Sequence, residues 1–160
     1  MSIAPRDEPE AAELIAIREE AEMLEGAAIV QPEGWAQPRG YSNGAVATGK
    51  FVSVAGQVGW NPSTCAFDSD DFAAQTRQTL HNVVEVLLAA GARPHDLVRL
   101  TWYVTDRAEY LAARKEIGAA YREIIGAHYP PMSLLFVSGL LEEQAKVEIE
   151  ATAVIPEHPV

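Results

Sequence analysis

The sequence predicts an α+β fold in which a single mixed β-sheet carries two helices on one face. Two observations predict it. Apolar residues recur at helical spacing in two segments and alternate in others, and the segments follow one another as hairpin, helix, strand, helix, strand and strand. This order favours helices packed together against one sheet. Of the 160 residues, 48% are hydrophobic, so one domain of this length can bury a substantial core.

The predicted sheet begins with two short β-prone runs, at residues 45–48 and 51–55. The pair Gly49-Lys50 separates them. Because a glycine-containing pair between two such runs is typical of a tight turn, the segment predicts a β-hairpin.

Residues 71–90 predict the first helix. Its apolar face would hold Phe72, Thr76, Leu80, Val83 and Leu87, and its polar face would hold Gln75, Gln78, Asn82 and Glu85. Gly91 follows at the position where glycine commonly ends a helix. A second helix is expected over residues 107–127. It must end before Pro130-Pro131, because proline prevents its continuation.

Three further strands are expected at residues 97–104, 133–137 and 147–155. Residues 133–137 are almost all apolar, which is typical of a strand covered on both faces. In the last strand, apolar residues alternate with polar ones that include Glu148 and Glu150. Two helices cover only one face of a sheet, so apolar side chains on the other face would need burial by another subunit. The pattern therefore favours an oligomer.

The first 30 residues differ from the rest in composition. They hold eight acidic residues and two arginines, a net charge of −6. Residues 8–25 are rich in strong helix formers. Helical spacing is shown by Leu14, Ile17, Ala21 and Leu24. Residues 1–30 thus predict an acidic, helical N-terminal extension that packs on the domain or on a partner; the alternative is a frayed acidic arm. Residues 31–156 form the expected domain, and residues 157–160 form a tail.

The composition argues against several classes of function. The chain holds 12 basic and 23 acidic residues, and its net charge of −11 disfavours nucleic acid as a partner. It has no apolar run of 18 residues, so we expect no membrane span, and no signal peptide is recognisable. A single cysteine, Cys65, suits a reducing compartment, so the expected location is cytoplasmic. Neither Cys65 nor the four histidines show metal-ligand spacing, so no metal is expected.

Four strings, in this order along the chain, carry a resemblance to a known family. They are GYSNG at 40–44, VAGQ at 54–57, QTRQTLHNV at 75–83 and KVEIEATAV at 146–154. On these strings the chain resembles the RidA (YjgF) family, once called L-PSP endoribonucleases, over roughly residues 38–156. The resemblance implies a chorismate-mutase-like fold, a homotrimer, and small-molecule clefts between neighbouring subunits. It also implies hydrolysis of reactive enamines and imines to ketoacids and ammonia, with no metal or organic cofactor.

The resemblance also implies which residues form the site. In the family, a glutamate on the last strand positions the attacking water, and this glutamate matches Glu148. The site tyrosine matches Tyr41, and a glycine–glutamine pair that contributes to substrate binding matches Gly56-Gln57. Trp60 follows that pair closely and is expected either to wall the cleft or to lie in a subunit interface. Tyr41 is expected either to donate a hydrogen bond to the ligand or to cap a subunit contact.

The chain departs from the family pattern at the residue that holds the substrate carboxylate. The family has an arginine in the motif Pro-Ala-Arg, whereas this sequence reads Pro130-Pro131-Met132. The other departures are Leu134 for a common cysteine, Ala55 for a common serine and Gly118 for a common asparagine. Methionine offers neither charge nor donor, and losing such a contact costs on the order of 2–5 kcal/mol. Met132 and Leu134 are therefore expected to be apolar lining of the substrate cleft.

Two other arginines are candidates to replace the missing charge. Arg39 and Arg99 could approach the ligand from another direction, although their simpler interpretation is solvated surface charge. Glu148 and Glu150 project from one strand face, where two neighbouring carboxylates raise one pKa and favour acid–base chemistry. The alternative is a pair of solvated glutamates on an exposed sheet.

The expected function is a RidA-like hydrolase or deaminase that acts on an enamine or imine other than the usual 2-imino acid. Its partners would be other copies of the chain, in the homotrimer, and a small molecule in the inter-subunit cleft. The alternative is a non-catalytic trimer that binds small metabolites in the same clefts. An endoribonuclease fits the net charge of −11 poorly.

Overall fold

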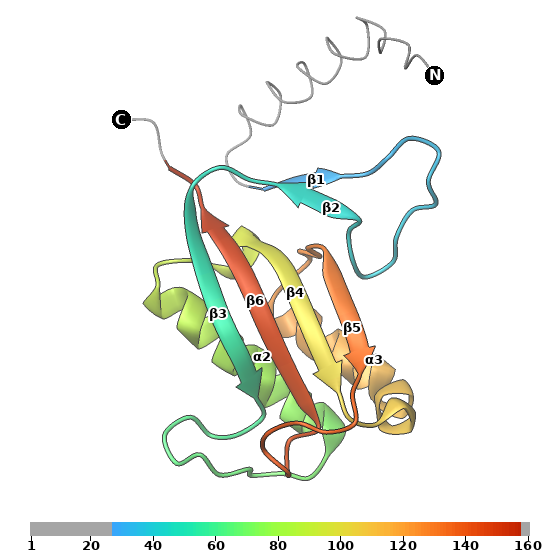
Figure 1. Ribbon diagram of the computed structural model, residues 1–160, viewed down its shortest axis with the longest axis vertical. Helices are drawn as coiled ribbons and strands as arrows, with labels where there is room; N and C mark the ends of the chain where they lie inside the picture. Colours follow the sequence, from blue (N-terminus) through green and yellow to red (C-terminus); the bar gives the residue numbers. More distant parts are fainter. Residues whose placement is uncertain (1–26, 158–160) are drawn as a thin grey trace, which may run out of the picture.

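Residues 27–157, the part of the chain that the computed structural model describes, build a mixed sheet backed by two helices (Figure 1). The main sheet has four strands in the order β3, β6, β4 and β5. Their bounds are Lys50–Val58 for β3, Val147–Ile155 for β6, Leu97–Val104 for β4 and Met132–Phe136 for β5. β4 and β5 run parallel, and the other two pairings are antiparallel. The predicted α+β class and mixed sheet are confirmed.

The predicted hairpin across Gly49-Lys50 is wrong. β2 (Gly44–Val46) pairs with β1 (Ala28–Val30) in a separate two-stranded sheet, and β3 pairs with β6. The physical reason is that β6 offers β3 a nine-residue partner with a matching buried face, which a three-residue strand cannot do. Strand β1 falls inside residues 1–30, the range expected to form the N-terminal extension. The helix expected over residues 8–25 lies outside the described residues.

The two helices lie behind the sheet on the same face (Figure 1). Helix α2 (Phe72–Ala89) begins where the Asp71 carboxylate accepts a hydrogen bond from the Ala74 amide, at 2.8 Å. It ends at the predicted place, with Gly91 at a φ of 81°. Helix α3 (Arg107–Ile124) ends three residues earlier than predicted, because Gly126 adopts a φ of 93° that stops the helix before the two prolines. A 3-10 turn, η1 (Pro94–Asp96), leads into β4.

The core lies between the helices and the sheet. Its fully buried side chains include Leu80, Val83, Leu87, Leu100, Val147 and Ile149. The predicted apolar face of α2 and the alternation in β6 are confirmed, and each such side chain contributes about 1.5–3 kcal/mol by leaving water. No helix of residues 27–157 covers the opposite face of the sheet, where Phe51 and Leu135 remain 66% and 45% exposed. No helix in this part of the chain has the length and hydrophobicity needed to cross a bilayer.

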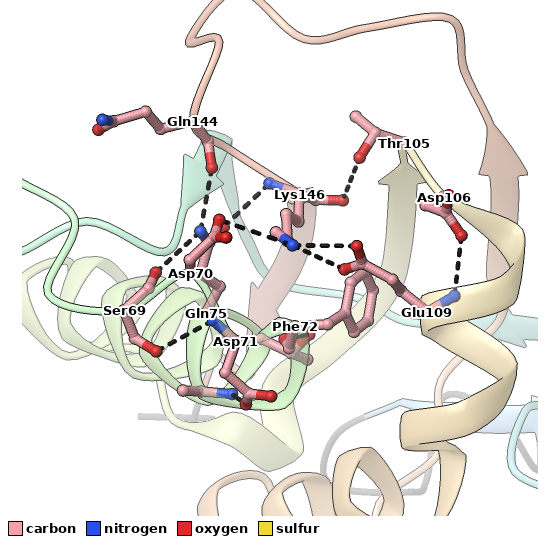
Figure 2. Close-up of polar contacts among 12 residues, drawn as sticks. Ser69, Asp70, Asp71, Phe72, Gln75, Thr105, Asp106, Glu109, Gln144 and Lys146 are labelled. Atoms are coloured by element: carbon pink, nitrogen blue, oxygen red, sulfur yellow. Dashed lines mark hydrogen bonds and ion pairs between the residues drawn. The ribbon is translucent and has the colours of Figure 1, made fainter.

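Two residues expected on the polar face of α2 are buried instead. The Gln75 side-chain amide donates to the carbonyls of Ser69 and Gln144, both at 3.0 Å, and its oxygen accepts from the Lys146 amide at 2.9 Å (Figure 2). Asn82 donates in the same way to two backbone carbonyls of the segment that ends β3. Buried amides of this kind satisfy loop backbone that would otherwise lack partners.

An ion pair joins the start of β6 to the first turn of α3. The Lys146 ammonium lies 2.9 Å from the Glu109 carboxylate and 3.6 Å from that of Asp70 (Figure 2). Together with the Gln75 amide, this contact fixes the position of β6 two residues before Glu148.

Candidate functional site

Glu148 lies on the outer face of the sheet, away from the helices. Its neighbour across β4 is Tyr103, and Glu150 lies two residues further along the same face beside Thr101. The Tyr103 hydroxyl donates to the Glu150 carboxylate at 3.0 Å, which raises the pKa of Tyr103. Partial burial raises the pKa of Glu148, and repulsion from Glu150 raises it further. Glu148 is thus a half-buried carboxylate that holds a proton more readily than a free glutamate does.

Gly56 lies directly beneath the Glu148 side chain. A Cβ at residue 56 would overlap the Glu148 carboxylate oxygen, so only glycine allows the carboxylate to occupy this position. The pairing register between β3 and β6 shifts between Val54 and Gln57, which places Gly56 in an irregular part of the strand. The Gln57 amide donates back to the Ala55 carbonyl at 3.2 Å. The structure therefore brings Glu148 and Gly56 together, with Gln57 next to them in β3.

Met132 and Leu134 lie on the opposite face of the sheet. Met132 is paired with Leu100 and Leu134 with Trp102, and both of these β4 residues are buried against the helices. They line a cavity of about 420 Å³ between α3 and the sheet, which we call the helix-side cavity. Its apolar and aromatic walls are Trp102, Tyr110, Ile117, Tyr121, Tyr129, Met132 and Leu134. Met132 is thus apolar cavity lining, on the face of the sheet that does not carry Glu148.

Three arginines also line the helix-side cavity: Arg39, Arg114 and Arg122. Arg39 is exposed and also lines this cavity, so it remains a candidate to approach the ligand, whereas the two arginines of α3 were not singled out from the sequence. The available signal was their spacing, because Arg114, Gly118 and Arg122 recur every four residues on one helix face. Arginines at such spacing are usually solvated, so the pattern alone does not identify a site.

Tyr41 belongs to a second cavity of about 420 Å³, which also contains Arg99 and shares Met132 with the first. The preceding residues Arg39 and Gly40 line the helix-side cavity, so this loop separates the two cavities. The loop is fixed by Ser42, whose hydroxyl donates to the Tyr129 carbonyl at 2.5 Å. Arg99, which lines this cavity, and Tyr103, the strand neighbour of Glu148, are four residues apart on β4, or roughly 13 Å along the strand.

Trp60 lines neither of these cavities. It lies in the loop after β3, with its ring 6.2 Å from that of Phe67, and its carbonyl accepts a hydrogen bond from the buried Asn82. Within residues 27–157, no group of His, Cys, Asp and Glu side chains is arranged to hold a metal ion.

The sequence matches the family model described as endoribonuclease L-PSP over residues 35–155. Among curated proteins, a 2-iminobutanoate/2-iminopropanoate deaminase of Salmonella typhimurium is 35% identical over 106 residues, which are 66% of this chain and 80% of that protein. A RutC family protein of Pyrococcus horikoshii is 30% identical over 125 residues, covering 78% of this chain and 95% of that protein.

Solved structures agree with this match. YyfB from Yersinia pestis, a Rid family protein of unknown function, superimposes with a TM-score of 0.69 at 36% identity, over 81% of this chain and 98% of that one. Escherichia coli TdcF with bound serine superimposes with a TM-score of 0.57 at 31% identity, over 79% of this chain and 98% of that one.

Proposed function

The chain belongs to the endoribonuclease L-PSP family, and we propose that it is a hydrolase that releases ammonia from an enamine or imine. The observation that carries this proposal is Glu148, a half-buried carboxylate with a raised pKa that lies over Gly56. A general base works best when its pKa lies closer to the operating pH than that of a free carboxylate. The 35% identity to a 2-iminobutanoate/2-iminopropanoate deaminase supports the same reaction class.

The proposed reaction needs only water and one proton-transfer group. Glu148 takes a proton from water as the water oxygen bonds to the C=N carbon, which gives a carbinolamine. That proton passes to the nitrogen, and Glu148 then takes the carbinolamine hydroxyl proton and transfers it to the nitrogen as the C–N bond breaks, so that ammonia leaves and a ketone remains. An enamine enters the same route after a proton is transferred to its carbon.

The proposed homotrimer completes the site. Glu148 and the helix-side cavity lie on opposite faces of the sheet, so one chain cannot apply both to one small molecule. In the trimer, the outer sheet face of one subunit meets the helix-side cavity of its neighbour, and the ligand lies between them. The open apolar side chains of the outer face, such as Phe51 at 66% exposure, support burial by another subunit.

We propose that Met132 replaces the arginine that the family uses to hold a substrate carboxylate. A 2-imino acid bound in that pose would lose a charge-assisted contact and would react slowly. The substrate of this chain is therefore a different imine or enamine.

The test is ammonia release from two kinds of substrate: enzymatically generated 2-aminoacrylate, which gives a ketoacid, and imines without a carboxylate, which give a ketone or aldehyde. We expect Glu148→Gln to lower kcat by about 100- to 10,000-fold on the preferred substrate. Glu85→Gln, the same change at an exposed site on α2, is the matched control and should have no effect. Turnover of 2-aminoacrylate equal to that of an arginine-bearing relative would contradict the proposed role of Met132.

A non-catalytic trimer that binds small metabolites is the second candidate. The observation that favours it is the aromatic helix-side cavity, whose lining residues, among residues 27–157, include no carboxylate or histidine. It would be favoured over the hydrolase if Glu148→Gln changed neither turnover nor ligand binding.

A further inference from the structure

We propose that Arg114 and Arg122 of α3, together with Arg39, form an anion-binding element that gives the helix-side cavity specificity for a carboxylate with a flat, apolar body. The proposal concerns the site of the proposed function and names its ligand class. It rests on the proposed function for the identity of the reaction, but the binding itself can be measured without turnover.

The two arginines of α3 lie on the same face of the helix. Arg114, Gly118 and Arg122 are each four residues apart, so they follow one helix face over about 12 Å. All three line the cavity. A Cβ on Gly118 would lie 3.7 Å from the Arg122 guanidinium, so this guanidinium lies next to the glycine. Glycine is a poor helix former, and at this position it leaves the helix surface between the two arginines without a side chain.

The charges of the three arginines lack protein partners in the described part of the chain. There, no carboxylate lies within ion-pair distance of Arg39, Arg114 or Arg122. By contrast, Arg77 on α2 pairs with Glu123 on α3 at 2.7 Å. Three guanidinium groups at one cavity, none of them in an ion pair with residues 27–157, make a local positive site in a chain of net charge −11. A planar carboxylate matches the paired donors of a guanidinium.

The walls of the helix-side cavity have a shape and chemistry that suit a flat ligand. Tyr121 and Tyr129 stack with their ring centres 5.4 Å apart, and Trp102 adds a third aromatic wall. Trp102 is 4% exposed, and its indole N–H finds no acceptor among residues 27–157. A ligand oxygen would give this donor a partner. The volume of about 420 Å³ falls within the range of about 300–1,000 Å³ typical of small-molecule sites.

This arrangement changes the expected effect of Met132 on ligand binding. The residue makes the β5 wall apolar, and the positive charge comes from α3 and from the loop before Tyr41. The ligand therefore keeps a carboxylate but presents it to α3, with its apolar body against Met132 and the aromatic rings.

Calorimetric binding of benzoate to the full chain carrying Glu148→Gln tests the proposal without turnover. Benzamide has the same ring without charge, and acetate has the charge without the ring. We expect benzoate to bind at least tenfold more tightly than either. Arg114→Gln combined with Arg122→Gln should weaken benzoate binding at least tenfold. Arg77→Gln, which removes a surface arginine from the neighbouring helix, should leave it unchanged.

A second variant guards against an indirect effect of the arginine changes. Gly118→Leu keeps both arginines but fills the space between them, and it should weaken benzoate binding at least tenfold while the circular dichroism spectrum and the oligomeric state are retained. The proposal is overturned if benzoate does not bind, if benzamide binds equally well, or if the double arginine variant binds as the parent does. Benzoate binding in a protein that hydrolyses no imine would overturn the proposed reaction and leave the anion site standing.

Discussion

The outer face of the sheet presents carboxylates, whereas the helix-side cavity on the other face is lined by guanidinium groups and aromatic rings. Glu148 and Glu150 project from one face of β6, and Ile149 between them projects into the core that borders the cavity. Because side chains alternate along a strand, the two chemistries are separated by the thickness of one sheet and cannot mix within a chain. In the proposed trimer, each subunit would carry two half-sites, one suited to moving a proton and one suited to holding an anion.

The largest effect is expected from the outer face. Gly56→Ala introduces a Cβ that overlaps the Glu148 carboxylate and displaces it. We expect kcat to fall by about 100- to 1,000-fold in steady-state assays, while benzoate affinity changes less than twofold. Gly139→Ala is the matched control, since a Cβ there meets nothing within 4 Å. Equal losses of kcat and benzoate affinity would show that the two faces do not act separately.

The next largest effect is expected on stability, from loss of the Gln75 side-chain amide that supports β6. Gln75→Ala leaves the Lys146 amide and the carbonyls of Ser69 and Gln144 without their partner. We expect a loss of about 2–3 kcal/mol in the free energy of unfolding and a Tm lower by about 4–10 °C. Glu85→Ala, at an exposed position of the same helix, should stay within about 0.5 kcal/mol. A Tm unchanged by Gln75→Ala would contradict the supporting role.

The pH dependence separates the two acids of the outer face. Glu148 acts as a base only when ionised, so its activity is lost as the pH falls through its raised pKa. Glu150→Gln removes the repulsive contribution, lowers the pKa of Glu148, and should move the acidic limb of the kcat/KM profile to lower pH by less than one unit. Arg114→Gln, on the other face, should leave that limb in place. A limb that does not move in Glu150→Gln would show that burial alone sets the pKa.

The smallest expected effect is on stability. Because the pKa of Glu148 is raised on folding, the folded state binds its proton more readily than the unfolded state. The resulting stability is present at low pH and is lost as the pH rises through the folded pKa. Glu148→Gln should therefore raise the Tm by about 1–2 °C at pH 7, at fixed protein concentration, and should make no difference near pH 3. A lower Tm at pH 7 would show that the ionised carboxylate is stabilised by its surroundings.

Period-based sequence reasoning located both helices of the domain, the strands after them and the outward direction of Glu148. It was wrong where distant contacts decide the outcome. β3 pairs with β6 and not with β2, the strand before it in the chain, since strand pairing depends on the partner's length and buried face. Gln75 and Asn82 are buried because their amides meet loop carbonyls that no local pattern reveals. Arg114 and Arg122 were missed because arginines at helical spacing are usually solvated.

β5 has a consequence for the life of the newly made chain. It is an edge strand of five residues, Met-Ser-Leu-Leu-Phe, with no charge and no proline, and no described strand pairs with its outer side. Strands of other copies of the chain can pair with an uncharged apolar edge strand, and repeated pairing of this kind builds aggregates. For the proposed trimer, orderly assembly would therefore compete kinetically with aggregation once the single chain has folded. Protein concentration and the speed of subunit docking, as much as the stability of the fold, would then decide how much usable protein a cell obtains.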